Sequence, residues 1–309
     1  MLSINIVENS VKIIEVERPE IHLSHEAIVM VTTTTISERD RFFQNNPNSI
    51  SFIPGSEFAG YIVETGSDVN KFDINDLVIN NSKSEEKKDL FFGSEKLPGG
   101  HAEYVKVPYA DQNLAKITPA IEERAVLLGG DYLGGFYSLE NFKKKFPKIN
   151  SFIVYGFYNS TIAAIHSLNM QPHRKIFAVE KNSMKKNLFN NLVNKVFDSK
   201  IPTCEVLIVG LIEDQTDLFE LIKSNNFKKI IFLEKQSASL FLINFDLAKN
   251  KIFIIEWPST KHIEILIKKL LTKTIELSAL ISHVIPIQDS INAYELYRKK
   301  NTTSVLLKP

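Results

Sequence analysis

Short apolar strands alternate with helices between about residues 123 and 257, and this alternation restricts the possible folds more than any other feature. The runs "SFIVYG", "KIFAVE", "EVLIVG", "KKIIFLE" and "KIFIIEW" are short and continuously apolar, as expected for strands that are buried on both faces. Helix-like segments such as "TIAAIHSLNM" and "DQTDLFELIKS" lie between them. The pattern therefore predicts an α/β fold with a doubly wound parallel sheet.

Residues 1 to about 118 have a different pattern. Segments such as "AIVMVTTTT", "GYIVETG", "DLVIN" and "AEYVKVP" are rich in β-branched and aromatic residues, and Gly, Asn, Asp and Pro separate them. They predict a domain of short β-strands. The polar and charged segment 81–90 is expected to be a solvated loop. The last residues, "SINAYELYRKKNTTSVLLKP", predict one amphipathic helix followed by one strand.

Size and charge exclude several classes of protein. With 309 residues, the chain is long enough for two domains and a substantial core. Its formal charge of +1 argues against a nucleic-acid or membrane partner that is held by bulk electrostatics. The sequence has neither a recognisable secretory signal nor an apolar run of membrane-spanning length. The single cysteine, Cys204, excludes an intrachain disulfide and a multi-thiolate zinc site, so we expect a cytoplasmic protein.

Four blocks of sequence follow one another in an order that a known family shares. They are "IPGSEFAGYIVETGSDVNKFDINDLVI", "GGHAEYVKVPYADQNLAKIT", "LLGGDYLGGFYSL" and "LISHVIPIQDSINAYELYRKKNTTSVLLKP". Together they resemble the medium-chain dehydrogenase/reductase superfamily, which contains zinc alcohol dehydrogenases and quinone reductases. The resemblance implies a GroES-like, partly barrelled β domain at residues 1–122 that residues 258–309 complete. It also implies a Rossmann nucleotide-binding domain at residues 123–257, with substrate and nicotinamide meeting between the two domains.

The resemblance further implies a partner. Many members of the family pair their Rossmann sheets edge to edge through the last strand, which here is "KIFIIEW". That run is apolar enough to favour contacts on both faces and along its edge. We therefore expect a homodimer that acts on a small-molecule substrate and binds neither nucleic acid nor a membrane.

The ligand positions for a catalytic metal are altered. In zinc-dependent members, a Cys, a His and a further Cys, Asp or Glu hold the ion. By resemblance these positions fall on Ser37, Ser56 and Asp131, and Glu57 follows the second of them. Hydroxyls do not replace a thiolate and an imidazole, because Zn²⁺ binds Cys, His and carboxylate ligands. We therefore expect no zinc, although an atypical metal enzyme that uses Asp131, Glu57 and water stays open as a minor alternative.

Losing the metal restricts the reaction. Hydride transfer to an isolated carbonyl concentrates negative charge on one oxygen, and zinc normally stabilises that charge as a Lewis acid. Conjugated enones and quinones spread the charge themselves, so weaker hydrogen-bond donors suffice for them. We therefore expect a zinc-independent reductase of small conjugated carbonyl or quinone-like compounds.

Several side chains are candidates for assisting this chemistry. Arg39 falls on the proton-relay position of the zinc enzymes and could hold an oxyanion, or it could be a surface residue. Asp40 is expected to organise its turn rather than to transfer protons, and Ser37 and Ser56 to line the cleft. His101 is left open between an acid–base catalyst and a structural histidine.

The dinucleotide fingerprint of the family should lie in "VYGFYNSTIAA". Its three glycine positions fall on Gly156, Tyr158 and Thr161, so only the glycine of the tight turn is retained. The start of the following helix, at Asn159 and Ser160, still offers backbone N–H groups that can bind an anion.

An acidic residue, Glu180, ends the second strand of this unit, where it could belong to a dinucleotide site or be only the polar end of the strand. Glu180 is placed to accept hydrogen bonds from the adenine ribose and would repel a 2′-phosphate, which favours NADH over NADPH. Lys181 and Lys185 oppose that preference, since either could pair with such a phosphate. The candidate cofactor-binding residues are therefore Gly156, Phe157, Tyr158, Asn159, Ser160, Thr161, Glu180, Lys181 and Lys185.

Two functions of different classes remain. The first is the NAD(P)H-dependent reductase. The second is a catalytically silent member of the family that binds a ligand or partner with the same fold. The second interpretation rests on the simultaneous replacement of two zinc ligands, the relay residue and two fingerprint glycines, because a fold alone does not establish a function.

Overall fold

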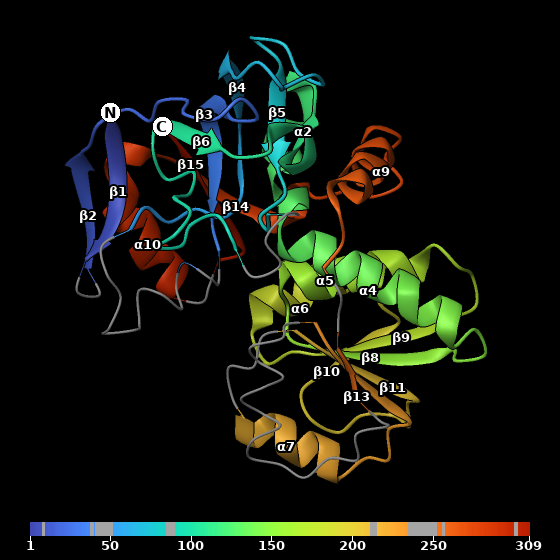
Figure 1. Ribbon diagram of the computed structural model, residues 1–309. Coiled ribbons are helices and arrows are strands. Elements are labelled where there is room, and N and C mark those ends of the chain that lie inside the picture. Colours follow the sequence, from blue (N-terminus) through green and yellow to red (C-terminus); the bar gives the residue numbers. More distant parts are fainter. Residues whose placement is uncertain are drawn as a thin grey trace. The chain divides into compact units, whose positions relative to one another are not determined.

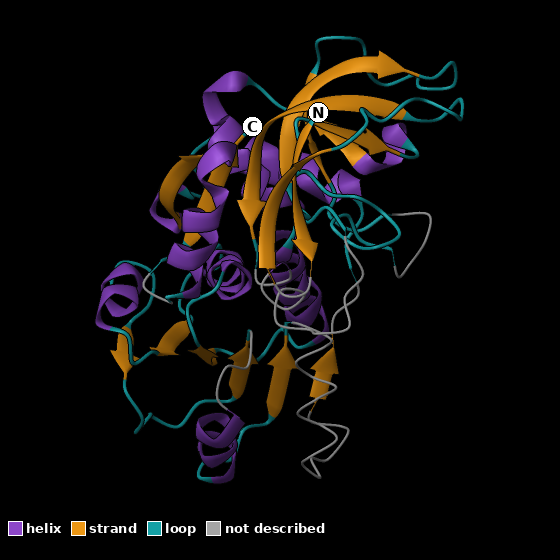
Figure 2. Cartoon of the chain, turned by 90° about the vertical axis from the view of Figure 1, so that its left-hand side faces the viewer, coloured by secondary structure: helices purple, strands orange, loops and turns teal. Residues whose placement is uncertain are grey.

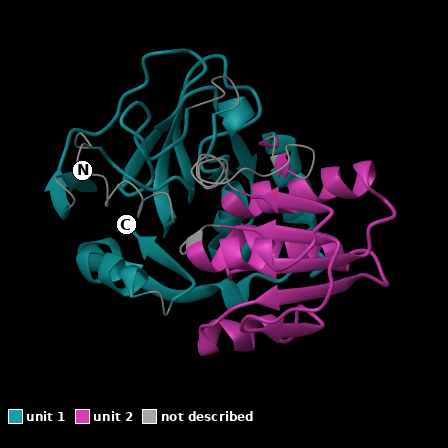
Figure 3. Cartoon of the chain, turned by 90° about the horizontal axis from the view of Figure 1, so that it is seen from below, with its two compact units in different colours: residues 1–130, 259–309 teal, residues 131–258 magenta. Residues whose placement is uncertain are grey.

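A computed structural model describes residues 1–7, 10–37, 40, 52–84, 90–210, 215–233, 252–254, 257–299 and 302–309. The chain forms two compact units, residues 1–130 with 259–309 and residues 131–258 (Figure 3). We call them unit 1 and unit 2. The boundaries predicted from the sequence, 122/123 and 257/258, stay a prediction of where independently folding domains begin and end.

Unit 2 contains one six-stranded parallel sheet (Figure 1). Its strands run in the order β10-β9-β8-β11-β12-β13, so the direction of strand succession reverses between β8 and β11. The sheet confirms the predicted doubly wound α/β fold. In such sheets ligands bind in a crevice at the point of reversal, which here lies at the carboxyl ends of β8 and β11. The strand bounds are β8 Ser151–Tyr155, β9 Lys175–Val179, β10 Lys195–Phe197, β11 Val206–Val209, β12 Lys229–Phe232 and β13 Ile252–Ile254.

Helices cover both faces of this sheet. Helices α4 and α5 lie on one face and α7 on the other (Figures 1 and 2). Phe142 of α4 packs edge-on against Phe152 of β8 and Phe253 of β13, with ring centroids 6.3 and 5.5 Å apart. On the opposite face, Leu218 and Leu221 of α7 join the apolar side chains of β11 and β12 in one buried cluster. The helix bounds are α4 Asp131–Lys145, α5 Asn159–Asn169, α6 Ser183–Phe189 and α7 Gln215–Lys223.

Unit 1 is mainly β-structure. A seven-stranded sheet runs in the order β14-β15-β3-β4-β5-β7, with β6 paired to β3, and β1 and β2 form a separate antiparallel hairpin. The C-terminal β15 pairs antiparallel with β3, Val305 opposite Ile36, so the last residues complete the sheet that the first residues begin. The strand bounds are β1 Leu2–Val7, β2 Ser10–Glu15, β3 Ala27–Ile36, β4 Phe58–Thr65, β5 Leu77–Asn80, β6 Tyr104–Val107, β7 Leu114–Lys116, β14 Ile281–Pro286 and β15 Ser304–Lys308.

Among the described residues of unit 1, the helices are short apart from two. They are α2 Ala110–Asn113, α3 Glu122–Ala125, α9 Thr260–Leu271 and α10 Ser290–Arg298. The segment "IEERAVLL" has the apolar spacing of a helix, but only α3 is α-helical there, between 3₁₀ turns at Pro119–Ile121 and Val126–Gly129. The described part of the chain contains no helix with the length and apolar character that crossing a membrane requires.

The structure corrects one local prediction. The segment 81–90 was expected to be a solvated loop, yet Asn81, Ser82 and Ser84 are buried. Their backbone N–H groups donate to the carbonyl oxygens of Asn113, Gly129 and Leu90, respectively. The start of the segment is therefore packed against unit 1, because these tertiary hydrogen bonds satisfy its buried backbone donors.

Candidate functional site

Asp40 joins the predicted site residue Ser37 to the loop before β4. Its Oδ2 accepts hydrogen bonds from the backbone N–H and the hydroxyl of Ser37, at 2.8 and 2.7 Å. Its Oδ1 accepts one from the backbone N–H of Gly55 at 2.9 Å. Asp40 is fully buried, so these donors compensate the cost of removing its carboxylate from water. The carboxylate thus organises the turn after β3 and ties it to the loop before β4.

The two serines at the former ligand positions face each other. The hydroxyl oxygens of Ser37 and Ser56 lie 3.5 Å apart, and both residues are buried. The Ser37 hydroxyl donates its hydrogen bond to Asp40. Of the two serines, Ser56 is therefore the one whose hydroxyl can donate to another group. Asn80 fixes the loop that carries Ser56: its Nδ2 donates to the Ser56 carbonyl at 2.9 Å, and its Oδ1 accepts from Phe58 N at 2.8 Å.

Glu57 is also buried, immediately after Ser56. Its Oε2 accepts a hydrogen bond from the Thr35 hydroxyl at 2.9 Å. A Cβ atom placed on Gly130 would lie only 1.6 Å from its Oε1, so the carboxylate is packed directly against that backbone. Both contacts lie within unit 1.

His101 is held at both ring nitrogens. Nε2 lies 2.8 Å from the carbonyl oxygen of Thr35, which can only accept, so Nε2 carries the proton. Nδ1 then accepts from the Tyr294 hydroxyl at 2.9 Å. Complete burial lowers the pKa of His101, while the Asp40 charge and the Thr35 carbonyl act in the opposite direction. A neutral, doubly engaged imidazole fits a structural role between β3 and α10.

Gly55 makes room for this histidine. Its φ of +93° lies in the left-handed region that favours glycine. A Cβ atom there would lie 2.4 Å from Cδ2 of His101. The glycine of the "PGSEF" block therefore serves both the backbone turn and the packing of His101.

Tyr294, Thr35 and Asn80 complete this cluster, and the sequence analysis did not single them out. Tyr294 could have been found, because Ser290, Ala293 and Tyr294 form the buried stripe of α10 at helical spacing. A buried tyrosine hydroxyl usually has a polar partner. Thr35 acts through its backbone carbonyl and Asn80 through a loop contact, and neither leaves a signal in the sequence pattern.

Two further residues were predicted for this group, Asp131 and Arg39. Asp131 is the first residue of α4 and belongs to unit 2. Arg39 lies outside the described residues.

The donor chemistry at the former ligand positions does not fit zinc. Two of the three positions carry serine hydroxyls, and one of these is already hydrogen-bonded to Asp40, so Asp131 is the only one of the three with a ligand that zinc favours. Neutral hydroxyls are poor ligands for Zn²⁺ compared with thiolate and imidazole. Within the described residues, no three His, Cys, Asp or Glu side chains gather in a way that could hold a metal ion.

The second group of predicted residues surrounds the turn from β8 to α5 in unit 2. Gly156 has φ of +81°, as the tight turn after the strand requires. Thr161 fixes the next residues: its Oγ1 accepts from the backbone N–H of Tyr158 at 2.9 Å and lies 2.9 Å from the carbonyl oxygens of Gly156 and Tyr158. Thr161 thus holds the turn by hydrogen bonds where the family has a glycine.

The Tyr158 ring lies over the ends of two neighbouring strands. A Cβ atom on Gly156 would be 2.5 Å from Cε2 of the ring, and one on Gly210 would be 2.9 Å from Cδ2. Gly156 and Gly210 follow β8 and β11, which pair in register up to Tyr155 and Val209. The ring therefore fills the crevice at the point where the strand order reverses.

Ser160 lies in the first turn of α5, and its side chain and the Tyr158 ring both lie next to Gly210. It is only 1% exposed, and its hydroxyl has no hydrogen-bond partner among the described residues. The hydroxyl lies 3.4 Å from the position that a Cβ atom on Gly210 would take. A buried polar atom without a partner is unusual in a folded protein.

Glu180 closes the β8–α5 turn from the side of β9. Its Oε2 accepts from Phe157 N at 3.2 Å and its Oε1 from Asn182 N at 2.8 Å. Phe157 is buried against Phe189 of α6, with ring centroids 4.9 Å apart. Asn159 is the first residue of α5.

The two predicted lysines differ in their partners. Lys181 forms an exposed ion pair with Asp217, whereas the ammonium of Lys185 lies 5.4 Å from the centroid of the Tyr158 ring. A cation over an aromatic face is attracted to it. Lys185 is thus the lysine that stands next to the crevice.

The strand, turn, helix start and Glu180 fit a dinucleotide, and one side chain does not. A backbone that approaches a pyrophosphate needs open space at the second glycine position, and there the Tyr158 ring lies against Gly156 and Gly210. With the ring turned away, Ser160 and the first N–H groups of α5 would face an anion.

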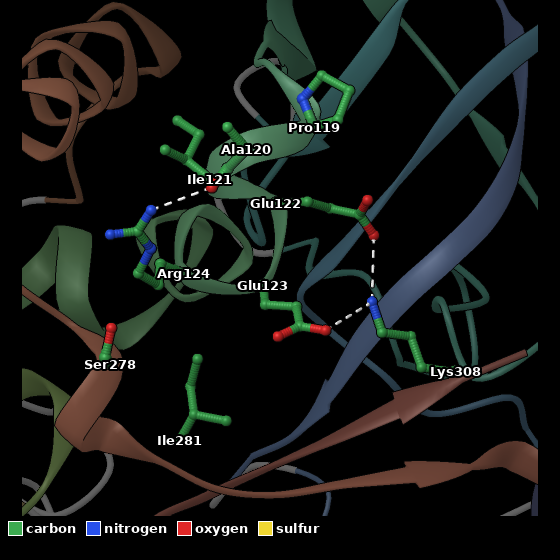
Figure 4. Close-up of a pocket in the computed structure, with 9 residues that line it drawn as sticks. All are labelled: Pro119, Ala120, Ile121, Glu122, Glu123, Arg124, Ser278, Ile281 and Lys308. Carbon is green, nitrogen blue, oxygen red and sulfur yellow. Dashed lines mark hydrogen bonds and ion pairs between the residues drawn. The ribbon is translucent and has the colours of Figure 1, made fainter.

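A surface hollow of about 370 Å³ lies elsewhere in unit 1 (Figure 4). It contains none of the predicted site residues. Lys308 pairs there with Glu123 at 3.2 Å and with Glu122 at 3.5 Å, and Arg124 donates to the Ala120 carbonyl. Because these charged groups already have partners, the hollow does not single out a ligand. Its lining residues are Pro119, Ala120, Ile121, Glu122, Glu123, Arg124, Ser278, Ile281 and Lys308.

Known proteins resemble both units. Residues 24–119 match the sequence profile of the alcohol dehydrogenase GroES-like domain. The zinc-type alcohol dehydrogenase B of Aspergillus flavus is 29% identical over 140 residues, which cover 40% of this chain and 33% of the relative. The chain thus spans about a third of that relative's length. The medium chain reductase/dehydrogenase ucsI of Acremonium is 25% identical over 223 residues, covering 64% of this chain and 75% of the relative.

The fold matches solved structures over its full length. An alcohol dehydrogenase of Escherichia coli CFT073, solved with the cofactor NADH, superimposes with a TM-score of 0.79 at 18% identity. The alignment covers 100% of this chain and 99% of that one. At this identity, the likeness establishes the fold.

Proposed function

We propose that the chain is a zinc-independent, NAD(P)H-dependent oxidoreductase of the medium-chain dehydrogenase/reductase type, as its similarity to alcohol dehydrogenases and to a medium chain reductase/dehydrogenase supports. Its proposed substrates are small conjugated carbonyl compounds and quinone-like compounds.

The observation that carries the proposal is the buried pair of hydroxyls at the former ligand positions. Ser37 and Ser56 lie 3.5 Å apart, and Asp40 and Asn80 hold them in place. The site is therefore organised, yet it offers hydrogen-bond donors in place of a Lewis acid. Such donors stabilise charge that is already spread over several atoms better than charge on a single oxygen.

The chemistry follows from this donor set. NAD(P)H held by Glu180 and the start of α5 would supply the hydride for the carbon conjugated with the carbonyl group. The carbonyl oxygen would then take up the displaced electron pair, and a proton from solvent would complete the reduction. The Ser56 hydroxyl is the donor available to that oxygen, since Ser37 already donates to Asp40. His101 holds β3 and α10 together and takes no part in the proton transfer.

Glu180 and the start of α5 are the proposed contacts for the cofactor. Glu180 lies at the end of β9 and accepts from Phe157 N and Asn182 N, which leaves oxygen lone pairs for a ribose hydroxyl. Its charge opposes a 2′-phosphate, and the nearby Lys185 reduces that effect. We propose NADH as the favoured cofactor.

A steady-state assay tests the function. Purified full-length protein is treated with a chelator and then mixed with NADH or NADPH and a panel of enones, quinones, saturated ketones and alcohols. The expected result is oxidation of the reduced nicotinamide with enones or quinones only, unchanged by the chelator. Loss of that activity on chelation, with recovery on adding zinc, would overturn the metal-free proposal.

A second candidate function is a silent scaffold that binds a ligand or partner without catalysis. The observation that favours it is the Tyr158 ring, which fills the crevice where a diphosphate would lie. A ligand that binds the native state raises the melting temperature. A melting temperature that does not change at millimolar NADH or NADPH, for wild type and for Tyr158→Ala, would favour the scaffold over the reductase.

We also propose a homodimer that pairs through β13, the last strand of the sheet of unit 2. An edge strand with unpaired backbone groups is a natural place for a second copy to add. Light scattering at micromolar concentration tests the assembly, and a monomer there argues against it. The cytoplasmic location that the sequence predicts is likewise a proposal, and cell fractionation tests it.

A further inference from the structure

We propose that the Tyr158 side chain is a plug that closes the nucleotide crevice of unit 2 and must turn outward before a dinucleotide diphosphate can bind. This inference rests on the proposed function for the identity of the ligand. It makes Tyr158 a residue that sets cofactor affinity.

The plug occupies the crevice between β8 and β11. The strand order reverses between these two strands, and ligands of doubly wound sheets bind outside the carboxyl ends of the strands at that place. The ring edge lies 2.5 and 2.9 Å from the Cβ positions of Gly156 and Gly210. Any side chain at either position would collide with the ring, so the two glycines provide the space it fills.

The groups next to the ring are suited to an anion. The Ser160 hydroxyl is buried without a partner among the described residues and lies close to Gly210. Ser160 also belongs to the first turn of α5, an eleven-residue helix whose first N–H groups attract negative charge. The unpartnered hydroxyl and the helix start point to the same small volume. A phosphate oxygen in place of the ring would satisfy Ser160.

The movement involves the side chain and leaves the turn intact. The backbone N–H of Tyr158 is bound to Thr161 Oγ1 at 2.9 Å, and Tyr158 has the extended φ and ψ of −139° and 160°. The backbone is therefore fixed by the same threonine that replaces the third fingerprint glycine. Lys185, 5.4 Å from the ring centroid, stabilises the inward position by a cation–π contact.

The plug lowers the affinity for any ligand that needs the crevice. When only a fraction of molecules has the ring turned outward, the apparent Kd equals the intrinsic Kd divided by that fraction. Without the ring, every molecule has an open crevice and the apparent Kd equals the intrinsic Kd. The same reasoning predicts that a larger ring in the same place weakens binding further.

Calorimetric titration of the full-length protein with NADH, and separately with ADP-ribose, tests the plug. Tyr158→Ala is expected to lower Kd by at least about tenfold. Tyr158→Phe keeps the ring and is expected to bind like wild type. The double variant Tyr158→Ala with Ser160→Ala is expected to bind several-fold more weakly than Tyr158→Ala, because it lacks the Ser160 hydroxyl.

The results that overturn the plug are equally definite. A Tyr158→Ala protein that binds NADH no more tightly than wild type, or that binds none, contradicts it. If Tyr158→Ala does not fold, Tyr158→Trp replaces it: weaker binding than wild type supports the plug, and equal or tighter binding contradicts it.

The outcome also separates the plug from the proposed function. Tight NADH binding by Tyr158→Ala without reduction of any enone or quinone removes the reductase and leaves the plug. Equal NADH affinities for wild type and Tyr158→Ala, together with enone reduction, remove the plug and leave the reductase.

Discussion

At the scale of single residues, the buried polar side chains of unit 1 fall into two kinds. His101 and Tyr294 satisfy each other and the Thr35 carbonyl, so their polar groups are used within the fold. Ser56 has one 3.5 Å contact with Ser37 and keeps a proton that a ligand oxygen could accept. We expect the first kind to affect stability and the second to affect the proposed reduction.

Removing the Tyr294 hydroxyl tests whether its hydrogen bond to His101 stabilises the fold. Tyr294→Phe leaves Nδ1 of the buried His101 without a donor, which is expected to lower the free energy of unfolding by about 1–3 kcal/mol. Urea unfolding of the two proteins measures the difference. The control is Tyr61→Phe on β4, whose hydroxyl makes no hydrogen bond within the described residues. An equal decrease in the free energy of unfolding in both variants would contradict a stabilising hydrogen bond between Tyr294 and His101.

The pH dependence of stability tests the neutral state of His101. Burial lowers its folded-state pKa below 6.5, so the unfolded chain binds the proton first as the pH falls. The free energy of unfolding should therefore be constant above pH 6.5 with respect to this group and should decrease below it, down to the folded pKa. The charge of the neighbouring Asp40 acts against this shift, and Tyr294 stays neutral because burial raises its pKa.

His101→Gln provides the comparison, since both proteins keep every other histidine. Urea unfolding between about pH 5 and 8 should show a flatter profile for His101→Gln than for wild type. Parallel profiles would mean that folding does not change the pKa of His101, which would contradict the lowered pKa of the buried imidazole.

Ser56 is the residue whose loss should affect catalysis most directly. Ser56→Ala removes the available donor and is expected to reduce kcat/KM for enone reduction by roughly tenfold or more. The melting temperature should change little, because the hydroxyl has one weak contact. Ser224→Ala, at the end of α7, serves as the control. An unaltered kcat/KM in Ser56→Ala would show that Ser56 is not the hydrogen-bond donor to the substrate oxygen.

At the scale of elements, the turn from β8 to α5 combines a predictable part with an unpredictable one. The apolar run that ends at Gly156 and the helix that follows were predicted from pattern alone, and β8 and α5 confirm both. The direction of the Tyr158 ring was not predictable, because it depends on Gly210, which lies 52 residues further along the chain (210 − 158), directly after β11. Side-chain direction at a turn is decided by tertiary neighbours that local spacing does not encode.

Substituting Gly156 tests how the turn and the ring depend on each other. Gly156→Ala puts a side chain at φ of +81° and 2.5 Å from the Tyr158 ring, and is expected to cost about 1–3 kcal/mol of unfolding free energy. The double variant Gly156→Ala with Tyr158→Ala keeps the backbone strain but removes the collision. It should therefore lose less stability than the sum of its two single substitutions. If urea unfolding shows that the double variant loses as much free energy as the two single variants together, the position of the Tyr158 ring next to Gly156 is contradicted.

At the scale of the whole molecule, alternation of strands and helices predicted the sheet of unit 2, because parallel strands that are buried on both faces are continuously apolar. The pairing of β15 with β3 came instead from the resemblance to a family, since contacts between Val305 and Ile36 leave no local pattern. The burial of Asn81, Ser82 and Ser84 was missed because their polar side chains look like those of a solvated loop. Position, rather than residue type, decided their environment.

The central prediction for the whole molecule is that this chain transfers a hydride to its substrate without a metal. Chelator-treated protein is given deuterated NADH and a conjugated enone, and the product is analysed by mass spectrometry and NMR. One deuterium on the carbon conjugated with the carbonyl is the result we predict. Product without deuterium, deuterium on the carbonyl carbon, or no product until zinc is restored would contradict the account.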